Sequence, residues 1–326
     1  MRILMLSEFY GKTGGINTHM VELSRFLKKH EVILSSNPES INIKPDIVHV
    51  HHAFTPLTFR AIKKANRKRI PVIVTNHTIA PFHNIYFWRL LKLGMKYLDE
   101  VNAIIAVSNA AKKFISNFTS KDVIVIPNGV DVKRFKPLKK EKEEKTLLYV
   151  GRLSVRKGVQ LLIPLLSKCL KEHDAELIIT GKDEMFMLYL LKLQRTICKN
   201  VGVLGFVPDA RLPELYNYAD ISLMPSLTME SFGITAIESL ACETPVIATK
   251  TGALPEIIRS GGITTNLWEF PKAVENLLSD PDRIRKLGKQ GRKLVEEEYS
   301  WEVVAKRIEN LYFKVLDGGM HEEHNT

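Results

Sequence analysis

Two cations follow a glycine-bounded turn in the second half of the chain. An apolar run at 146–150 predicts a strand, and Gly151, Arg152, Lys157 and Gly158 come directly after it. An Arg guanidinium offers a planar fork of donors and a Lys ammonium a compact charge, and both suit a diphosphate. The segment therefore predicts an anion site. The alternative is a surface loop with two solvated cations.

Two acidic residues, Glu230 and Glu238, lie on either side of a predicted helix start near Phe232. The backbone N–H groups of residues 232–234 would form an anion site at the positive end of the helix dipole. Glu238 would reach a ribose diol, as acidic residues do in other nucleotide sites. The alternatives are a helix-capping acid at Glu230 and a solvated helix residue at Glu238.

Glycines also follow the first apolar run, at 3–6, where Gly11, Gly14 and Gly15 precede a predicted helix. Glycine allows a tight turn and a close approach of the backbone to a phosphate or a sugar. The spacing matches neither a Walker loop nor the GxGxxG pattern. An ordinary strand–helix turn fits these glycines equally well.

Elements that could position these residues recur along both halves of the chain. Strands are predicted at 3–6, 32–35, 46–50, 72–75, 103–107, 123–126, 146–150, 177–180, 201–204, 221–224 and 246–248. Such apolar strands, separated by helices, are typical of parallel sheets covered on both faces. The charged stretch LKKEKEEK predicts a linker. We expect an α/β protein with two doubly wound, Rossmann-like domains facing across a cleft, at 1–140 and 141–298, and a helix at 299–318 crossing back.

Composition narrows the class of protein. Of 326 residues, 45% are hydrophobic and 25% charged, which is ordinary for a globular protein and excludes a disordered one. No apolar stretch is long enough to span a bilayer, and the N-terminus lacks a signal-peptide pattern, so we expect a cytoplasmic protein. Three scattered cysteines form no CxxC pair, so buried free thiols are predicted rather than a disulfide framework or a zinc site.

Charge is unevenly distributed. Residues 1–140 contain 23 Lys and Arg against 9 Asp and Glu, a balance of +14 within a total of +11. A basic half favours nucleic acid, membranes or anionic substrates as partners. The chain has no zinc-finger or RNP motif and no interleaved aromatic pattern, so we do not expect a nucleic-acid partner.

The motifs together resemble the family 4 glycosyltransferases, which have the GT-B fold. The matching segments are GGINTH (14–19), VTNH (74–77), VSNAAKK (107–113), IPNGVD (126–131), YVGRLSVRKG (149–158), LGFVPDARLPELYNYADISLMPS (204–226), the acids of 230–238, ACETPVIAT (241–249) and SWEVVAKRIENLY (300–312). The resemblance covers nearly the whole chain. It implies retaining transfer of a hexose from a UDP- or GDP-sugar to an acceptor hydroxyl, with the donor held mainly by the C-terminal domain.

The resemblance also implies residue roles. The implied catalytic residues are His77, Glu230, Arg152 and Lys157. The implied donor-binding residues are Gly14, Gly15, Gly151, Arg152, Lys157, Glu230, Phe232, Gly233, Ile234 and Glu238. His77 matches a family histidine near the sugar and the acceptor, although a histidine at a strand end, considered alone, is more often structural. Cations and the helix N-terminus would stabilise the leaving diphosphate, so no metal and no cofactor beyond the nucleotide sugar is expected.

One carboxylate pair could be mistaken for a metal motif. Asp280 and Asp282 follow one predicted helix and precede another, so we interpret them as a helix start. The sequence departs from the family at 181–184 and 261–268, which leaves UDP and GDP donors unseparated, and at Glu243, where glycine is usual. A sugar-nucleotide epimerase and a non-catalytic partner protein are the alternatives.

Two segments favour an anionic membrane surface and a lipid-linked acceptor. The cations Arg60, Lys63, Lys64, Arg67, Lys68 and Arg69 crowd one predicted helix. Residues 81–96 mix aromatics and cations at helical spacing, as interfacial helices do. The alternative is that the aromatics are core and the cations solvated, which leaves the acceptor and a peripheral position at the inner membrane face open.

Overall fold

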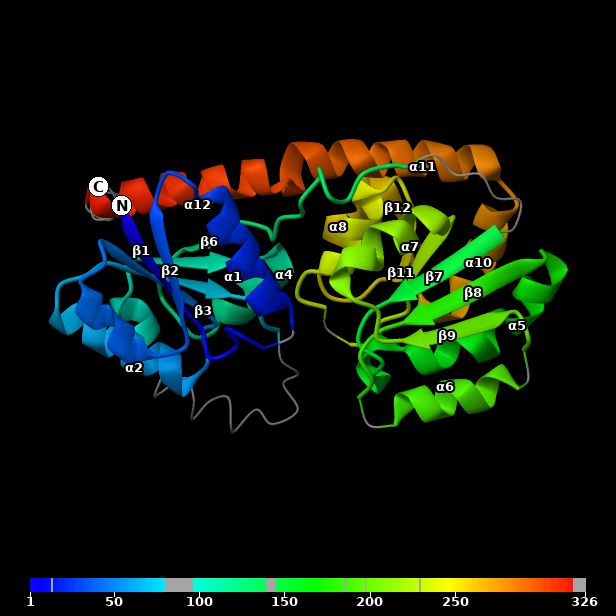
Figure 1. Ribbon diagram of the computed structural model, residues 1–326, viewed down its shortest axis with the longest axis horizontal. Coiled ribbons are helices and arrows are strands. Elements are labelled where there is room, and N and C mark those ends of the chain that lie inside the picture. Colours follow the sequence, from blue (N-terminus) through cyan, green and yellow to red (C-terminus); the bar gives the residue numbers. More distant parts are fainter. Residues whose placement is uncertain are drawn as a thin grey trace. The chain divides into compact units, whose positions relative to one another are not determined.

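The computed structural model describes residues 1–12, 14–79, 96–138, 145–184, 186–196, 198–228 and 230–318. They form two compact units (Figure 1). Unit 1 contains Met1–Gly129 and the C-terminal segment from Trp301, and unit 2 contains Val130–Ser300. The expected boundary after residue 140 falls inside unit 2, because the Val130 N–H already donates to the Tyr299 carbonyl at 2.8 Å.

Unit 1 is built on a parallel six-stranded sheet of order β2-β1-β3-β4-β5-β6. Its strands are β1 (Arg2–Leu6), β2 (Glu31–Ser35), β3 (Ile47–His51), β4 (Val72–Asn76), β5 (Ala103–Ala106) and β6 (Val123–Val125). Its described α-helices are α1 (Gly15–Phe26), α2 (Pro56–Arg67), α4 (Asn109–Ile115) and α12 (Trp301–Leu316), with 3-10 helices η1 (Pro38–Ile43) and η2 (Lys96–Glu100). All of its strand pairings are parallel, as predicted.

The C-terminal helix α12 completes the core of unit 1. Its buried face, which includes Trp301, Ile308 and Tyr312, packs with Met20 and Leu23 of α1. Figure 1 shows α12 beside the strands of the N-terminal sheet, although it comes from the far end of the chain. The expected helix at 299–318 is thus part of unit 1.

Unit 2 has a second parallel six-stranded sheet, of order β12-β11-β10-β7-β8-β9. Its strands are β7 (Lys145–Val150), β8 (Ala175–Thr180), β9 (Val201–Gly205), β10 (Ile221–Met224), β11 (Val246–Thr249) and β12 (Gly262–Thr265). Its described α-helices are α5 (Leu162–Glu172), α6 (Met187–Arg195), α7 (Leu212–Tyr218), α8 (Ile234–Ala241), α9 (Leu254–Ile258), α10 (Phe270–Leu278) and α11 (Pro281–Leu294).

Short 3-10 or π segments connect these elements of unit 2. They are η3 (Val155–Lys157), η4 (Val159–Leu161), η5 (Asp209–Arg211), η6 (Arg259–Gly261), η7 (Leu267–Glu269) and η8 (Val295–Tyr299).

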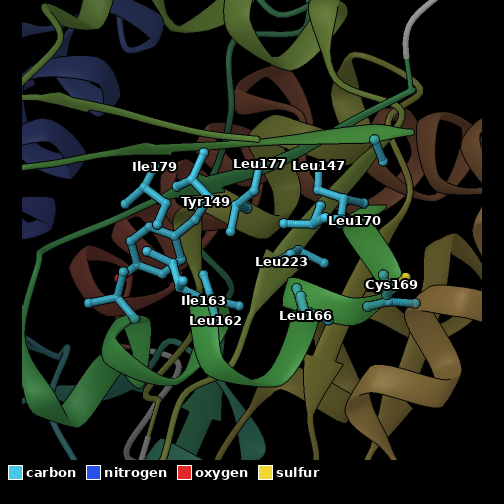
Figure 2. Packing of buried hydrophobic residues seen from close by; sticks show 14 of the residues in the cluster. Leu147, Tyr149, Leu162, Ile163, Leu166, Cys169, Leu170, Leu177, Ile179 and Leu223 are labelled. Atoms are coloured by element: carbon cyan, nitrogen blue, oxygen red, sulfur yellow. The ribbon is translucent and has the colours of Figure 1, made fainter. Parts of the chain in front are cut away.

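The core of unit 2 forms where α5 covers β7, β8 and β10 (Figure 2). Leu162, Leu166 and Leu170 recur at helical spacing and point to the sheet, where Leu147 and Leu177 meet them. Such a fully buried leucine contributes roughly 1.5–3 kcal/mol relative to an exposed one. The core fixes the carboxyl ends of the strands, from which the loops with the predicted site residues emerge.

Several predictions can be compared directly with these elements. Cys169, Cys198 and Cys242 are buried free thiols, as predicted. Asp280 caps α11, and its side chain accepts from the Arg283 N–H at 2.9 Å, so the helix-start interpretation is confirmed. No strand was predicted at β12, because GITT has a single apolar side chain. None of the helices in the described part of the chain is both long and apolar enough to cross a membrane.

Candidate functional site

Lys157 and Glu230 form an ion pair in unit 2. Lys157 ends η3, Glu230 lies in the loop between β10 and α8, and both side chains are largely buried. Burial lowers the pKa of Lys157, and the Glu230 carboxylate opposes that shift. The structure thus brings together two of the predicted site residues and leaves the ammonium with a counterion inside the fold.

Arg152 also lies in the loop that follows β7, and its side chain is exposed. Its guanidinium pairs with Glu184 at 3.0 Å. The buried Tyr149 hydroxyl donates to the Arg152 carbonyl at 2.7 Å, and a Cβ at Gly151 would approach that hydroxyl to 3.0 Å. Tyr149 therefore positions the turn that carries Arg152. Tyr149 falls in a predicted strand, and nothing in its spacing indicates this positioning role.

Two glycines fix the backbone around the ion pair. Gly158 has φ 71°, and a Cβ there would lie 1.9 Å from the Pro225 carbonyl oxygen. Gly252 has φ 56°, and a Cβ there would lie 2.2 Å from the Glu230 carbonyl oxygen, which also accepts from the Ala253 N–H at 2.8 Å. Both positions need glycine for conformation and for space. Gly252 was not predicted, because its partner is distant in sequence.

Glu238 lies in a different environment from Glu230. It is on α8, partly buried, and its carboxylate accepts from the Tyr216 hydroxyl of α7 at 2.9 Å. Burial raises the pKa of Glu238 to about 7, although the Tyr216 hydrogen bond and the Arg134 charge oppose the rise. The solvated-residue alternative is therefore wrong for Glu238. Tyr216 was missed as its partner.

The start of α8 differs slightly from the prediction. The helix begins at Ile234 rather than near Phe232, because Gly233 takes φ 97° as the N-cap residue. The Phe232 ring is buried and packs edge-on against Tyr299, with ring centroids 5.8 Å apart. Glu243, where glycine is usual in the family, has φ 58° just after α8, which gives the physical reason for that usual glycine.

The glycines of unit 1 begin α1. Gly14 is the N-cap with φ 148°, and Gly15 is the first helical residue. A Cβ at Gly14 would meet nothing within 4 Å, so its backbone angle rather than crowding favours glycine. The Gly11 N–H donates to the Asn17 side chain at 2.9 Å, which ties the turn to the helix. Open space beside Gly14 is compatible with the predicted close approach of a ligand.

His77 belongs to a group of histidines in unit 1. Its Nε2 lies 3.4 Å from His51 Nδ1, and its ring centroid lies 4.7 Å from that of His19. His49, two residues before His51 on β3, bonds Tyr312 and Thr75 through its two nitrogens, each at 2.6 Å. The local signal that was missed is the strand VHVH, whose alternation places His49 and His51 on one face.

These histidines are held neutral by burial. Burial lowers the pKa of His19 to about 4 and of His49 to about 3, and a neighbouring imidazole adds to the lowering at His49. The pKa values of His51 and His77 are also far below the usual range, chiefly through burial. Neutral imidazoles accept protons or hydrogen bonds, and they are also metal ligands.

Among the described residues, His19, His51 and His77 form the one group that could hold a metal ion. Their ligand nitrogens all lie within 4.8 Å of one another. Nitrogens bound to one zinc ion at about 2.0–2.1 Å lie closer together than that, so the rings would have to converge. The absence of a metal remains an expectation, and this triad is the place where it can be tested.

His52 adds backbone strain beside this group. Its φ of 142° is unusual for a residue with a Cβ. Its Nδ1 accepts from the Phe54 N–H at 3.1 Å, and its Nε2 lies 2.9 Å from the Thr78 hydroxyl. Such strain persists where surrounding contacts determine the conformation, and it is common at functional sites.

Two family models match the chain. Residues 131–294 match the description "Glycosyl transferases group 1", and residues 33–134 match "Glycosyltransferase Family 4". An uncharacterized glycosyltransferase of Methanocaldococcus jannaschii is 31% identical over 82% of this chain and 75% of its own length. A phosphatidylinositol N-acetylglucosaminyltransferase subunit of Arabidopsis thaliana is 25% identical over 97% of this chain and 75% of its own length.

Solved structures share the fold. Sucrose-phosphate synthase of Thermosynechococcus elongatus has a TM-score of 0.79 and 19% identity, over 97% of this chain and 99% of that one. HepE of Anabaena, in complex with UDP, has a TM-score of 0.79 and 19% identity, over 96% of this chain and 100% of that one. With its two parallel six-stranded sheets, this chain has the GT-B fold, and it belongs to the family 4 glycosyltransferases.

Proposed function

We propose that this glycosyltransferase moves a hexose from a UDP- or GDP-sugar to an acceptor hydroxyl with retention and without a metal ion. The observation that carries the proposal is the Lys157–Glu230 ion pair in the loops that follow β7 and β10. The solved structure of HepE, which shares the fold, contains bound UDP, so UDP is the first nucleotide to test.

The donor diphosphate would replace carboxylates as the partner of two cations. Lys157 pairs with Glu230, and Arg152 pairs with Glu184. Diphosphate oxygens can accept from both cations, which would release Glu230 to hydrogen-bond the transferred sugar. Glu238, kept near Tyr216, would hydrogen-bond the ribose.

The proposed transfer takes place on one face of the sugar. The acceptor oxygen bonds to the anomeric carbon while the bond from that carbon to the diphosphate oxygen breaks. The electron pair of the broken bond stays on the diphosphate, and the hydroxyl proton passes to the leaving oxygen. Arg152, Lys157 and the backbone at the start of α8 stabilise the developing negative charge. The low pKa of His77 would keep its imidazole uncharged, so no charge-stabilising role is proposed for it.

Calorimetry of the whole protein with UDP and GDP in the presence of EDTA tests the donor site. Arg152→Ala and Lys157→Ala should each weaken binding by about 1.5–3 kcal/mol, the scale of hydrogen bonds to charged groups. Lys168→Ala, an exposed cation of α5, is the matched control and should bind as the wild type does. Unchanged affinity in both site variants would remove the diphosphate assignment.

The two acids provide a second test. Glu230→Gln should lose most turnover and keep nucleotide affinity, because its proposed contact is to the sugar. Glu238→Ala should instead weaken nucleotide binding. The reverse pattern would exchange the two roles. NMR of the product should show the anomeric configuration of the donor, and an inverted product or conversion of the donor alone would contradict the proposed reaction.

The acceptor is proposed to be lipid-linked, with the enzyme peripheral at the cytoplasmic face of an anionic membrane. One relative is named as a phosphatidylinositol N-acetylglucosaminyltransferase subunit, which supports a lipid acceptor. The α2 region adds exposed cations: Arg60, Lys63, Arg67, Lys68 and Arg69, whereas Lys64 pairs with Glu39. Residues 81–95 of the second predicted segment lie outside the described residues.

Sedimentation with anionic vesicles tests this position. Vesicle binding should weaken as salt rises and after substitution of the α2 cations. No binding at low salt would favour a soluble acceptor.

A further inference from the structure

The outer face of α6 in unit 2 is apolar. Four large side chains recur there at helical spacing and are exposed: Phe186 by 84%, Tyr189 by 72%, Leu193 by 56% and Leu190 by 37%. Figure 1 shows α6 at the margin of unit 2. We call this set the α6 face. Scattered apolar residues are normal on a surface, but a contiguous stripe at positions i, i+3, i+4 and i+7 marks a contact surface.

The α6 face is separate from the side of the helix that holds the fold together. Met187 and Leu191 point inward and belong to the core of unit 2. Phe186 precedes the helix with φ 63°, a left-handed conformation that costs a residue with a Cβ some free energy. The Phe186 ring is nonetheless almost fully exposed, so it contributes little burial free energy to the folding of unit 2.

Cations accompany this face. The sequence from 185 to 200 contains no Asp or Glu, and Lys192, Arg195 and Lys199 are all exposed. None of the three pairs with a carboxylate in the part of the chain that the structure describes. An apolar stripe of aromatic and leucine side chains with free cations beside it is the pattern of helices that lie in a membrane interface.

We propose that the α6 face docks unit 2 onto an anionic lipid surface, with the apolar side chains in the headgroup–acyl boundary and the three cations at the phosphates. A second copy of the chain is the less suitable occupant, because a stable protein interface uses about 20–30 residues a side and this face is one short helix. The proposal does not depend on the donor or on the acceptor. It is also separate from the α2 cations, which belong to unit 1.

Flotation of the full-length protein with vesicles of phosphatidylcholine and phosphatidylglycerol tests the proposal. Tyr189→Gln/Leu193→Gln should reduce the partition coefficient at least about tenfold, and Lys192→Gln/Arg195→Gln by about fivefold per cation at low salt. Trp268→Gln, which removes another exposed aromatic of unit 2, is the matched control and should bind as the wild type does. Vesicles of phosphatidylcholine alone should bind far less.

A probe at the face adds a direct readout. The three native cysteines are buried, so a fluorophore sensitive to polarity can be attached selectively after Leu193→Cys. Its emission should shift to the blue with anionic vesicles and not with neutral ones. Wild-type affinity in both double variants, or a probe that stays in water on bound vesicles, would overturn the proposal. Concentration-dependent dimers that the Tyr189→Gln/Leu193→Gln variant abolishes would assign the face to a second copy instead. Turnover of a soluble acceptor analogue should be unchanged throughout, so a failure here is distinct from a failure of the proposed reaction.

Discussion

The buried histidines of unit 1 and the partly buried Glu238 of unit 2 respond to removal from water with pKa shifts in opposite directions. Burial favours the uncharged form of any titratable group. A histidine reaches that form by losing a proton, so the pKa of His19 falls to about 4, whereas a carboxyl reaches it by keeping one, so the pKa of Glu238 rises to about 7. The two units should therefore differ in how their stability depends on pH.

Lys157 shows what changes when a counterion is present. Its ammonium is also largely buried, yet it faces the Glu230 carboxylate, which favours the charged form. Unit 2 can therefore keep fixed charges where a charged donor is proposed to bind. In unit 1 the clustered imidazoles are buried without a carboxylate partner among the described residues, and burial keeps them uncharged.

The largest expected effect is the acid sensitivity of unit 1. The pKa values of His19 and His52 are about 4 and that of His49 about 3, all below the value of 6.5 in the unfolded chain, chiefly through burial. The unfolded state therefore binds more protons, and stability is lost as pH falls from about 6.5 to about 4. We expect a loss of about 2 kcal/mol for each imidazole between pH 7 and pH 5.

Hydrogen exchange of the whole protein, corrected for intrinsic rates, measures this loss in the peptides of unit 1. His52→Asn is the matched variant, because the Asn oxygen can replace Nδ1 as the acceptor for the Phe54 N–H and cannot titrate. This variant should reduce the loss of unit 1 stability between pH 7 and pH 5 by the share of one imidazole. If the protection of unit 1 stayed constant down to pH 5, the buried imidazoles would not lower its stability in acid.

The next effect concerns the ion pair. Lys157→Met leaves the buried Glu230 carboxylate without a partner and should cost about 3–5 kcal/mol of unfolding free energy. Lys157→Met/Glu230→Gln removes both charges and should recover most of that loss, although it should not bind nucleotide normally. Urea unfolding of the two variants provides the measurement. Equal losses of unfolding free energy in the two variants would mean that Lys157 and Glu230 do not stabilise each other.

A smaller effect of opposite sign to that of the histidines is expected for Glu238. Because its folded pKa of about 7 exceeds the unfolded value of 4.5, its contribution is fully present below about pH 4.5 and is lost as pH rises through 7. Since the side chain is partly exposed, we expect unit 2 to lose only about 1–2 kcal/mol between pH 5 and pH 7. Glu238→Gln should abolish that loss in hydrogen exchange of unit 2, and an unchanged slope would assign it to other groups.

The smallest effect tests whether the two units unfold separately. The Ser108 hydroxyl caps α4 in unit 1, and the Asp280 carboxylate caps α11 in unit 2. Replacing either residue with Ala should cost about 1 kcal/mol. Exchange should rise only in the unit that carries the variant. A rise in both units would indicate cooperative unfolding of the whole chain, and the opposite pH slopes would then partly cancel.

The sequence was sufficient for elements whose signal is local. Strands buried on both faces are nearly continuous apolar runs, so β1 and β7 could be recognised, whereas the Thr-rich β12 could not. Gly and Pro residues indicated the loops. Helix α8 begins at Ile234, later than predicted, because Gly233 is its N-cap residue. Membership of the domains was harder, because Val130 joins unit 2 through a hydrogen bond to Tyr299, which lies far along the chain.

The site was predicted residue by residue but not as an arrangement. Lys157 and Glu230 were each assigned from their own motifs, and their pairing joins loops that are far apart in sequence. The Tyr216 partner of Glu238 comes from another helix, so no spacing could reveal it. Likewise, only folding brings His19 of α1 beside His51 and His77.

Unit 1 is assembled from both ends of the chain, and this has a consequence for the order of folding. During synthesis at about 5–20 residues per second, every residue of unit 2 is made before α12 exists. Until α12 emerges, His49 lacks its Tyr312 partner and the core of unit 1 lacks Trp301. Synthesis of unit 1 thus begins before that of unit 2 and ends after it. Its apolar strands remain without the packing of α12 during that interval, when they are exposed to aggregation.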